Sequence, residues 1–340
     1  MTAMCYKVTH YQYKDRIGNL KAEAVGVVSG EKHFPIFPGN MIFKPLTKSK
    51  PFSTPLYAYA EVFWSTVINE YFMPAPQYEL AICEGYEAVN EKYLDYGTAV
   101  PVAYKEGESL LNLLEFFRKY PDKKVDIDNY VNYCQMFYDY RDIFESEFFQ
   151  KHEDLAEQLA MQVLISVLKG DQNYHYENVA FLCDKDGGII SLAPMIDHEF
   201  STYFMFPDDV SRHVYWLMEL SKSIRGWEVR PGEYDNIKEH YPQVTEEFLN
   251  KAEKLKTALT EASEDFLIRG NTEYPDHADS SAWLIGKARY KDKDEEKASA
   301  YEAELYGKGK KLDFRDVSIS AINEIKAVIS QMEEVLRKRE

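Results

Sequence analysis

Short apolar segments, rich in β-branched residues and punctuated by glycine, run through the N-terminal third of the chain, as is typical of strands and hairpins. Strands are expected over residues 24–28, 40–44, 78–83 and 99–104. Between the second and third of these, residues 59–68 space their apolar side chains as a helix does, up to the Pro-Ala-Pro break at 74–76. The pattern predicts a mixed sheet with one helix.

Helical spacing dominates after residue 109. Apolar positions predict helices over 110–117, 130–140, 155–168, 214–221, 244–267 and 319–336. Two short apolar segments, 179–182 and 189–192, are joined through Asp186-Gly187-Gly188 and predict a hairpin within this helical part. Residues 271–311, rich in Asp, Glu, Lys and Gly, are expected to form a mobile or weakly packed insertion.

Composition narrows the class of protein. The chain has 340 residues, of which 45% are hydrophobic and 14% aromatic, which is enough for two cores. Two domains are therefore expected, over residues 1–105 and 106–340. The net charge of −17 argues against nucleic-acid binding, because phosphate contacts need clustered Lys and Arg. The four cysteines, Cys5, Cys83, Cys134 and Cys183, are scattered without zinc-ligand spacing and are expected to be reduced packing thiols.

The N-terminus lacks the apolar core of a signal peptide, and no apolar segment approaches the ~20 residues that span a bilayer. These features predict a cytoplasmic protein with no membrane partner. Non-classical export signals leave no legible pattern, so secretion as an effector remains an alternative.

One polar segment, from Lys169 to Asn178, carries the strongest chemical signal. It reads Lys-Gly-Asp-Gln-Asn-Tyr-His-Tyr-Glu-Asn. Phosphoryl transfer from ATP uses an acceptor-orienting group a few residues before an Asn that binds magnesium, and a separate Asp that bridges the metal to the phosphates. Asn173, Asn178 and Asp197 stand at these three places, and the predicted hairpin would bring Asn178 and Asp197 together. A magnesium and ATP site is therefore predicted.

Loops rich in Asp and Asn are also common turn chemistry, so this segment has a purely structural alternative. A metal site is favoured by Asp197, which begins the polar triplet Asp-His-Glu behind an apolar strand, where packing does not call for a carboxylate. His175 could be a base or a metal ligand, but its position after Asn173 is more typical of a brace that acts through ring hydrogen bonds. His198 has the same alternatives.

Three further segments complete the prediction. Lys44, which follows Met-Ile-Phe, is expected to point its ammonium at the α- and β-phosphates, and Glu61 in the next helix is expected to hold it there. The plain alternatives are an edge-strand lysine and a solvated helix face. The phosphate-binding turn is expected at Ser29 and Gly30; GxGxxG is absent, and an ordinary hairpin explains this turn equally well.

Together these segments resemble the HipA-like serine/threonine kinases. The likeness rests on Phe-Lys-Pro at Lys44, Ala-Glu-Val at Glu61, the loop Gly-Asp-x-Asn-x-His-x-x-Asn-x-Ala-Phe and the element Ala-Pro-Met-Ile-Asp-His. It is similar to the compact, CtkA-like branch of that bacterial family, and the loop also resembles phosphatidylinositol kinases. The resemblance implies an α+β, two-lobed protein-kinase-like fold with a small β-rich N-lobe and a large helical C-lobe, which carries the catalytic loop 170–178.

The resemblance also implies ATP and Mg²⁺ as cofactors, a protein substrate phosphorylated on Ser or Thr, and an antitoxin partner if the chain belongs to a toxin-antitoxin pair. Lys44 would position the phosphates, Glu61 would orient Lys44, and Asn178 and Asp197 would hold the metal. Asn173 departs from the family, which has Asp there, and an amide cannot accept the substrate proton. Three functions stay open: a serine/threonine kinase impaired at Asn173, naturally or by a deliberate Asp→Asn change; a nucleotide-binding pseudokinase that acts as an interaction module; and a lipid kinase.

Overall fold

The computed structural model describes residues 4–7, 13–14, 20–21, 34–37, 41–47, 56–84, 93–101, 105, 107–127, 140–171, 174, 176–196, 198, 201, 237–267, 271–273 and 311–337. The strand predicted over 24–28, the helix predicted over 214–221 and nearly all of the helix predicted over 130–140 lie outside these residues.

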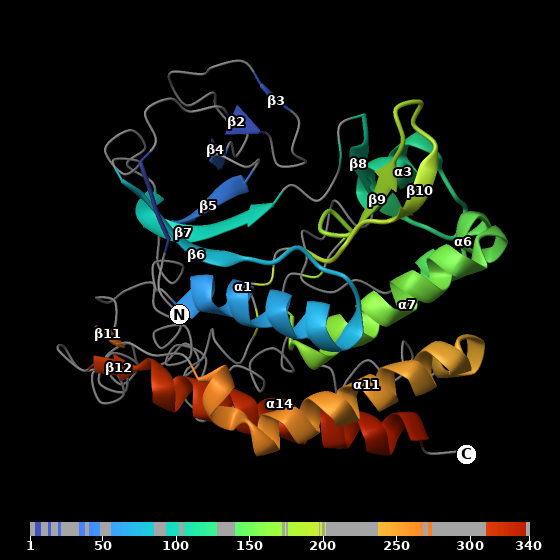
Figure 1. The fold of residues 1–340 in the computed structure, drawn as a ribbon. Helices are drawn as coiled ribbons and strands as arrows, with labels where there is room; N and C mark the ends of the chain where they lie inside the picture. Colours follow the sequence, from blue (N-terminus) through green and yellow to red (C-terminus); the bar gives the residue numbers. More distant parts are fainter. Residues whose placement is uncertain are drawn as a thin grey trace, which may run out of the picture.

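A seven-stranded sheet forms the N-terminal part of the fold (Figure 1). Its order is β1 (Met4–Lys7), β6 (Glu79–Glu84), β7 (Tyr93–Pro101), β5 (Met41–Thr47), β4 (Phe34–Phe37), β2 (Tyr13–Lys14) and β3 (Leu20–Lys21). β1 runs parallel to β6, and the other neighbours are antiparallel. Strands are present where 40–44, 78–83 and 99–104 predicted them, but β5 continues through Pro45 to Thr47 and β7 already begins at Tyr93. Pro45 is tolerated because the register shifts between Pro45 and Thr47, as at a bulge.

Helix α1 (Leu56–Val67) continues into a short π-helix, η1 (Ile68–Phe72). Every residue of α1 except Thr66 is buried, which is the pattern of a helix that is covered on all sides. α1 contacts β6 and β7, and η1 contacts α11 (Pro242–Glu261). Figure 1 shows α1 between the large sheet and the pair formed by α11 and α14 (Phe314–Arg337).

The remaining elements follow in chain order. They are β8 (Ser109–Asn112), α3 (Leu113–Lys119), α5 (Arg141–Phe144), α6 (Glu147–Lys151), α7 (Glu153–Leu168), β9 (Ala180–Cys183), β10 (Ile189–Leu192), η3 (Ser263–Phe266), β11 (Asn271–Glu273) and β12 (Lys311–Asp313). The helices predicted over 155–168, 244–267 and 319–336 are present as α7, α11 and α14, with a turn of 3-10 helix, η3, after α11. β11 and β12 pair and close the base of the predicted insertion, whose residues 274–310 are not described.

The helix predicted over 110–117 is wrong at its beginning. Leu110 and Leu111 lie in strand β8, and α3 begins only at Leu113. The side chain of Asn112 accepts a hydrogen bond from the Glu115 backbone N–H at 2.8 Å and so caps the helix. β8 pairs with β9, and the predicted hairpin β9–β10 thereby becomes a three-stranded sheet.

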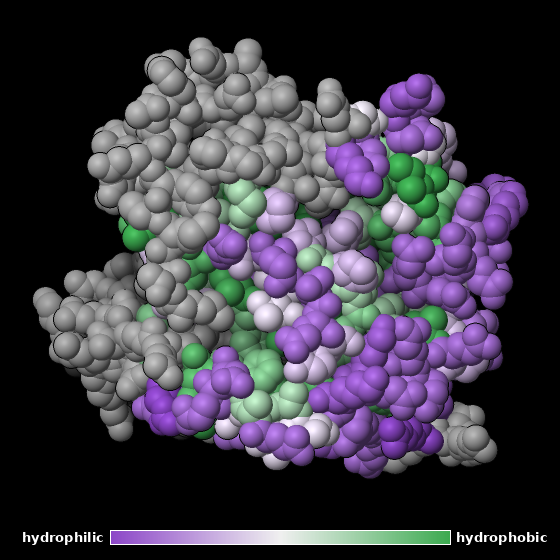
Figure 2. Space-filling model, in the orientation of Figure 1, coloured by the Kyte–Doolittle hydropathy of each residue, from purple (hydrophilic) through white to green (hydrophobic). Residues whose placement is uncertain are grey.

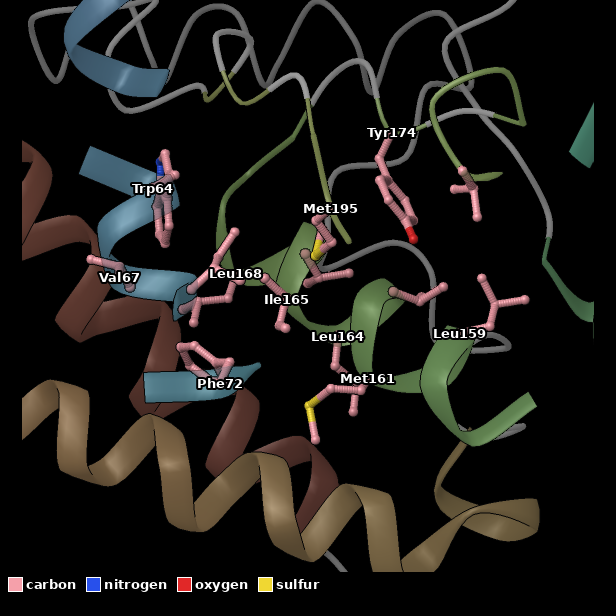
Figure 3. Close-up of a cluster of buried hydrophobic side chains, with 14 of the residues drawn as sticks. Trp64, Val67, Phe72, Leu159, Met161, Leu164, Ile165, Leu168, Tyr174 and Met195 are labelled. Carbon is pink, nitrogen blue, oxygen red and sulfur yellow. The ribbon is translucent and has the colours of Figure 1, made fainter. Parts of the chain in front are cut away.

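One cluster of buried apolar side chains connects these elements (Figure 3). Trp64, Val67 and Phe72 approach it from α1 and η1, while α7 supplies the row from Leu159 to Leu168. Phe72 stacks on Phe248 of α11 with ring centroids 5.5 Å apart. The described residues thus form a mixed fold of helices and mostly antiparallel sheets. The two-lobed arrangement and the division at residue 105 stay predictions.

One region of the molecular surface is mainly hydrophilic. In the view of Figure 2, hydrophilic side chains cover the right and lower parts of the molecule, where α6, α7, α11 and α14 lie. Within the described part of the chain, no helix is both long and apolar enough to cross a membrane.

Cys83 and Cys183 are buried free thiols, and burial raises the pKa of Cys83 to about 12. Both therefore have the packing role expected of them.

Candidate functional site

Lys44 and Glu61 form an ion pair at the junction of the sheet and helix α1. Lys44 lies on β5, opposite Thr98 of β7, and its side chain is 18% exposed. Its Nζ contacts Oε1 of Glu61, whose side chain is 1% exposed. The plain alternatives do not fit, because β5 lies between β7 and β4 rather than at an edge and Glu61 is not solvated. The contact predicted from the order of the elements is therefore present, while a role toward a nucleotide stays a prediction.

The second carboxylate oxygen of Glu61 reaches a third segment. Oε2 accepts a hydrogen bond from the backbone N–H of His198 at 2.7 Å. Glu61 is the only charged residue of α1. Burying an unpaired carboxylate would be strongly unfavourable, so its charge is tolerated here only because both oxygens are satisfied. One carboxylate thus links β5, α1 and the segment after β10.

A glycine on β7 allows the two strands to approach closely at Lys44. A methyl group at Gly97 would overlap the carbonyl oxygen of Lys44 and crowd the Cα of Pro45. Gly97 pairs with Pro45 in the ladder, next to the Thr98 and Lys44 pair. The position of the Lys44 backbone therefore depends on the absence of a side chain at residue 97.

The end of α7 carries a buried cation that the sequence did not mark as functional. The Lys169 side chain is fully buried, and its Nζ donates to Oδ2 of Asp171 at 2.7 Å. The same ammonium lies 2.9 Å from Nδ1 of His198. The Lys169 carbonyl accepts from the Ser201 hydroxyl at 2.7 Å, and Asp171 forms a β-bridge with Ser201. Lys169 and Asp171 are therefore connected to His198 and Ser201.

His198 acts as a brace rather than as an exposed base. Burial lowers its pKa well below 6.5, and the positive charges of Lys169 and Lys44 lower it further, while the Met195 backbone opposes the shift. The ring is therefore neutral, and Nδ1 accepts from the Lys169 ammonium. Of the alternatives for His198, the structure agrees with the bracing one.

The side chain of Tyr174, which lies between positions 173 and 175 of the loop, is hydrogen-bonded to helix α7. Its hydroxyl donates to Oε1 of Gln162 on α7 at 3.0 Å. Gln162 Nε2 in turn donates to the carbonyl of Ala193 at 2.9 Å. Burial, and then the charge of Asp171, raises the pKa of Tyr174 well above 10, so the hydroxyl keeps its proton. Figure 3 shows Tyr174 directed toward α7.

Asn178 is buried at the end of the loop, two residues before β9 begins at Ala180. The backbone around it is fixed to the beginning of α3: the N–H of Leu113 donates to the carbonyl of Val179 at 2.9 Å, and that of Leu114 to Tyr176 at 3.3 Å. The other predicted site residues, Asn173, His175, Asp197, Ser29 and Gly30, lie outside the described residues. The structure thus brings together Lys44, Glu61 and His198, the neighbour of Asp197 in the chain.

Asp171 is the described carboxylate nearest in sequence to position 173, where the resemblance implies a catalytic Asp, but its carboxylate is already paired within the protein. Its side chain is 2% exposed and is paired with Lys169. A general base must come within hydrogen-bond distance of the substrate proton, and a buried carboxylate that is held by an ammonium does not. In this structure Asp171 therefore has a structural role.

Sequence reasoning missed Gln162, Lys169, Asp171 and Ser201 as members of this network. A signal was available for the first two, because Gln162 and Lys169 are long polar side chains, seven residues apart, in and directly after the mostly apolar segment of α7. No comparable signal marks Ser201, whose partner becomes a neighbour only through the fold.

The expected metal requires oxygen ligands. Asn178 would supply an amide oxygen and Asp197 a carboxylate, which is the donor chemistry that Mg²⁺ prefers. Among the residues that the structure describes, no group of three or more His, Cys, Asp or Glu is arranged to hold a metal ion. The predicted Mg²⁺ ligands therefore stay Asn178 and Asp197, together with the phosphates of a nucleotide.

Comparison with known proteins gives a likeness to a solved structure. No protein-family model and no curated protein matches the chain. The crystal structure of the Helicobacter pylori proinflammatory kinase CtkA is similar over 94% of this chain and 98% of that one, with 12% sequence identity and a TM-score of 0.42. A likeness at this level does not establish a shared family or activity. The HipA-like resemblance therefore stays a prediction from the sequence motifs.

Proposed function

We propose that the chain is a phosphotransferase of the kinase class, of HipA-like type, which binds ATP with Mg²⁺ beside Lys44, Glu61 and the loop 170–178. The observation that carries the proposal is the buried Lys44–Glu61 pair, whose carboxylate also holds the backbone of His198. An internal strand, a buried helix and the segment that contains Asp197 are thereby joined at one carboxylate. Packing alone accounts for neither charge, whereas phosphate binding by an oriented ammonium does.

In this proposal each residue has a limited task. The Lys44 ammonium binds the α- and β-phosphates, and Glu61 fixes its direction. Asn178 and Asp197 hold Mg²⁺, which neutralises charge on the phosphates when it is bound. The acceptor is a Ser or Thr hydroxyl of a protein substrate, in the cytoplasm, and an antitoxin is a further candidate partner. Nucleic acid is not expected to bind.

Asn173 supports a second candidate, a nucleotide-binding pseudokinase. An amide cannot take the proton of the acceptor hydroxyl, and a general base typically contributes about 10²- to 10⁴-fold to the rate. Phosphoryl transfer depends mostly on positioning and on the metal, so ATP binding should survive the loss of the carboxylate. The chain is therefore expected to bind ATP well and to transfer phosphate slowly.

The first test is binding. ATP with Mg²⁺ should raise the melting temperature, because a ligand that binds only the folded state stabilises it. Asp197→Ala and Lys44→Ala should each remove most of this shift, whereas Lys124→Ala, which breaks an exposed ion pair with Glu145, should leave it unchanged. A full shift in Asp197→Ala would contradict the assignment of the metal site.

The second test separates the two candidates. Autophosphorylation and transfer to a generic protein substrate would be measured for the chain and for Asn173→Asp at matched ATP and Mg²⁺. A gain of at least about tenfold supports a kinase impaired at residue 173. Unchanged, negligible transfer with ATP still bound favours the pseudokinase, and transfer to phosphoinositide rather than protein would indicate a lipid kinase.

A further inference from the structure

We propose that Gln162 and Lys169, two buried polar residues along α7 and at its end, are positioning residues that hold the loop 171–178 against the segment 193–201 before any ligand binds. The inference rests on the proposed function for its consequence, because these are the two segments that contain the proposed metal ligands Asn178 and Asp197. The hydrogen bonds that Gln162 and Lys169 make to these two segments all join described residues.

The first brace is Lys169. Its ammonium donates to Asp171, at the start of the loop, and to His198, in the facing segment, at 2.7 and 2.9 Å. Its own carbonyl accepts from Ser201 at 2.7 Å. Through the N–H of His198 the same brace reaches Glu61, and therefore Lys44.

The second brace is Gln162. Its side-chain carbonyl accepts from the Tyr174 hydroxyl at 3.0 Å, and its amide donates to the Ala193 carbonyl at 2.9 Å. One side chain therefore touches both segments, as Lys169 does. Tyr174 is further fixed by stacking on Tyr140, with ring centroids 5.6 Å apart.

The two braces lie on one face of the helix. They are seven residues apart, and with 100° of rotation per residue their directions differ by only about 20°. A rise of 1.5 Å per residue separates them by about 10 Å along the axis. α7 thus contacts the two site segments at two points, which fixes their relative orientation as well as their distance.

Stability alone is a poor explanation for these side chains. A buried ion pair is often no more stabilising than apolar side chains of the same size, and most of the buried residues of α7 are apolar. Polar side chains instead fix how the two segments are oriented relative to each other, because each hydrogen bond is satisfied in only one arrangement of the segments. Ligands that are held in place before the metal arrives lose less freedom when it binds.

The test uses Lys169→Met and Gln162→Met, which keep approximate volume and remove the hydrogen bonds. Tyr174→Phe removes one of the Gln162 contacts from the other side. Ser166→Ala is the matched control, because the Ser166 side chain is also buried on α7 but its hydroxyl donates to the carbonyl of Val163 in the same helix, and the substitution leaves the backbone contacts in place. The Mg²⁺ concentration that gives half-maximal ADP binding would be measured by calorimetry, together with ADP affinity in EDTA.

Both methionine variants should raise the required Mg²⁺ concentration by about 10- to 100-fold, the range typical when groups that orient metal ligands are lost. Tyr174→Phe should have a smaller effect in the same direction, while ADP affinity in EDTA and the behaviour of Ser166→Ala should stay within about twofold. An unchanged Mg²⁺ requirement in folded Gln162→Met and Tyr174→Phe would overturn the proposal. These two variants decide the question if Lys169→Met does not fold.

A readout without ligand separates this inference from the proposed function. Amide hydrogen exchange of the free protein should become faster in 171–178 and 193–201 together in the methionine variants, and stay unchanged in α11. If the parent chain binds no Mg²⁺ and ADP, the proposed function fails, but coupled exchange still supports the braces. If exchange in the two segments is unaffected, the braces fail whether or not the nucleotide binds.

Discussion

At the scale of single residues, the site is organised by charges that have been removed from water. Glu61 accepts from Lys44 with one oxygen and from the His198 backbone with the other. Lys169 donates to Asp171 and to His198. His198 touches both networks, the first through its backbone N–H and the second through its ring. Burial first, and then the charges of Lys169 and Lys44, lower the pKa of the ring and keep it neutral.

Gly97 offers a test of how strictly Lys44 is placed. Gly97→Ala should lower stability by about 1–3 kcal/mol, the usual effect of forcing extra volume into a packed site, because the new methyl group meets backbone atoms of Lys44 and Pro45. Urea denaturation measures the change. The control is Gly187→Asn, at a turn where φ is +82° and nothing lies near a Cβ; Asn tolerates that conformation, so little change is expected. Equal stability of both variants would show that β5 and β7 can move apart freely.

The sequence could predict part of this site and not the rest. Lys44 and Glu61 were found because each is a charge in an apolar element and because their order matches a known arrangement. Lys169 and Asp171 are two residues apart and resemble ordinary helix-end chemistry. Their partner His198 becomes a neighbour only when β9 and β10 return the chain, which no local pattern reveals. Nothing of the predicted phosphate turn at Ser29 and Gly30 is tested.

At the scale of elements, long periodic helices were predicted well and a short junction was not. α11 and α14 repeat their apolar spacing over several turns and bury one face each, while α7 is almost continuously apolar and is buried on all sides from Leu159 to Leu168. Leu110 and Leu111 fit a strand as well as a helix, and periodicity cannot separate the two over so few residues. The deciding residue was Asn112, which is followed by Glu at the third position and caps α3.

This cap can be tested directly. Asn112→Ala should lower the free energy of unfolding by about 0.5–2 kcal/mol, because the Glu115 N–H loses its acceptor. Asn112→Asp keeps an oxygen at the same place and should retain most of the stability, since a carboxylate is favourable at a helix N-terminus. Denaturation of the two variants side by side gives the comparison, and an equal loss in both would indicate that the cap is not the important contact.

At the scale of the whole molecule, the apolar core does not stop at residue 105. Phe72 of η1 stacks on Phe248 of α11, and Tyr59 of α1 meets Phe314 of α14 edge to face at 5.3 Å. These contacts join a helix of the first predicted domain to helices of the second. Whatever the division of the fold into lobes, α1 shares its stability with the helices beneath it.

The expected consequence is that α1 and α11 open together. Phe72→Ala should destabilise the fold by about 3–5 kcal/mol, the usual range for removing a buried aromatic ring. Native-state hydrogen exchange should then show the opening free energy of 56–67 and 242–261 falling by similar amounts. A fall confined to α1 would mean that the two parts are stable separately, and Tyr120→Ala, at an exposed ring, serves as the control.

The spacing of Gln162 and Lys169 along α7 also limits how this chain can change over evolutionary time. Substitutions between the two residues alter packing one side chain at a time, and the helix keeps its register. A single inserted or deleted residue in that interval would instead rotate one brace by about 100° away from the other and shift it by about 1.5 Å along the axis. Gln162 and Lys169 could then no longer face the same two segments. In relatives of this protein the interval should therefore vary in composition but not in length.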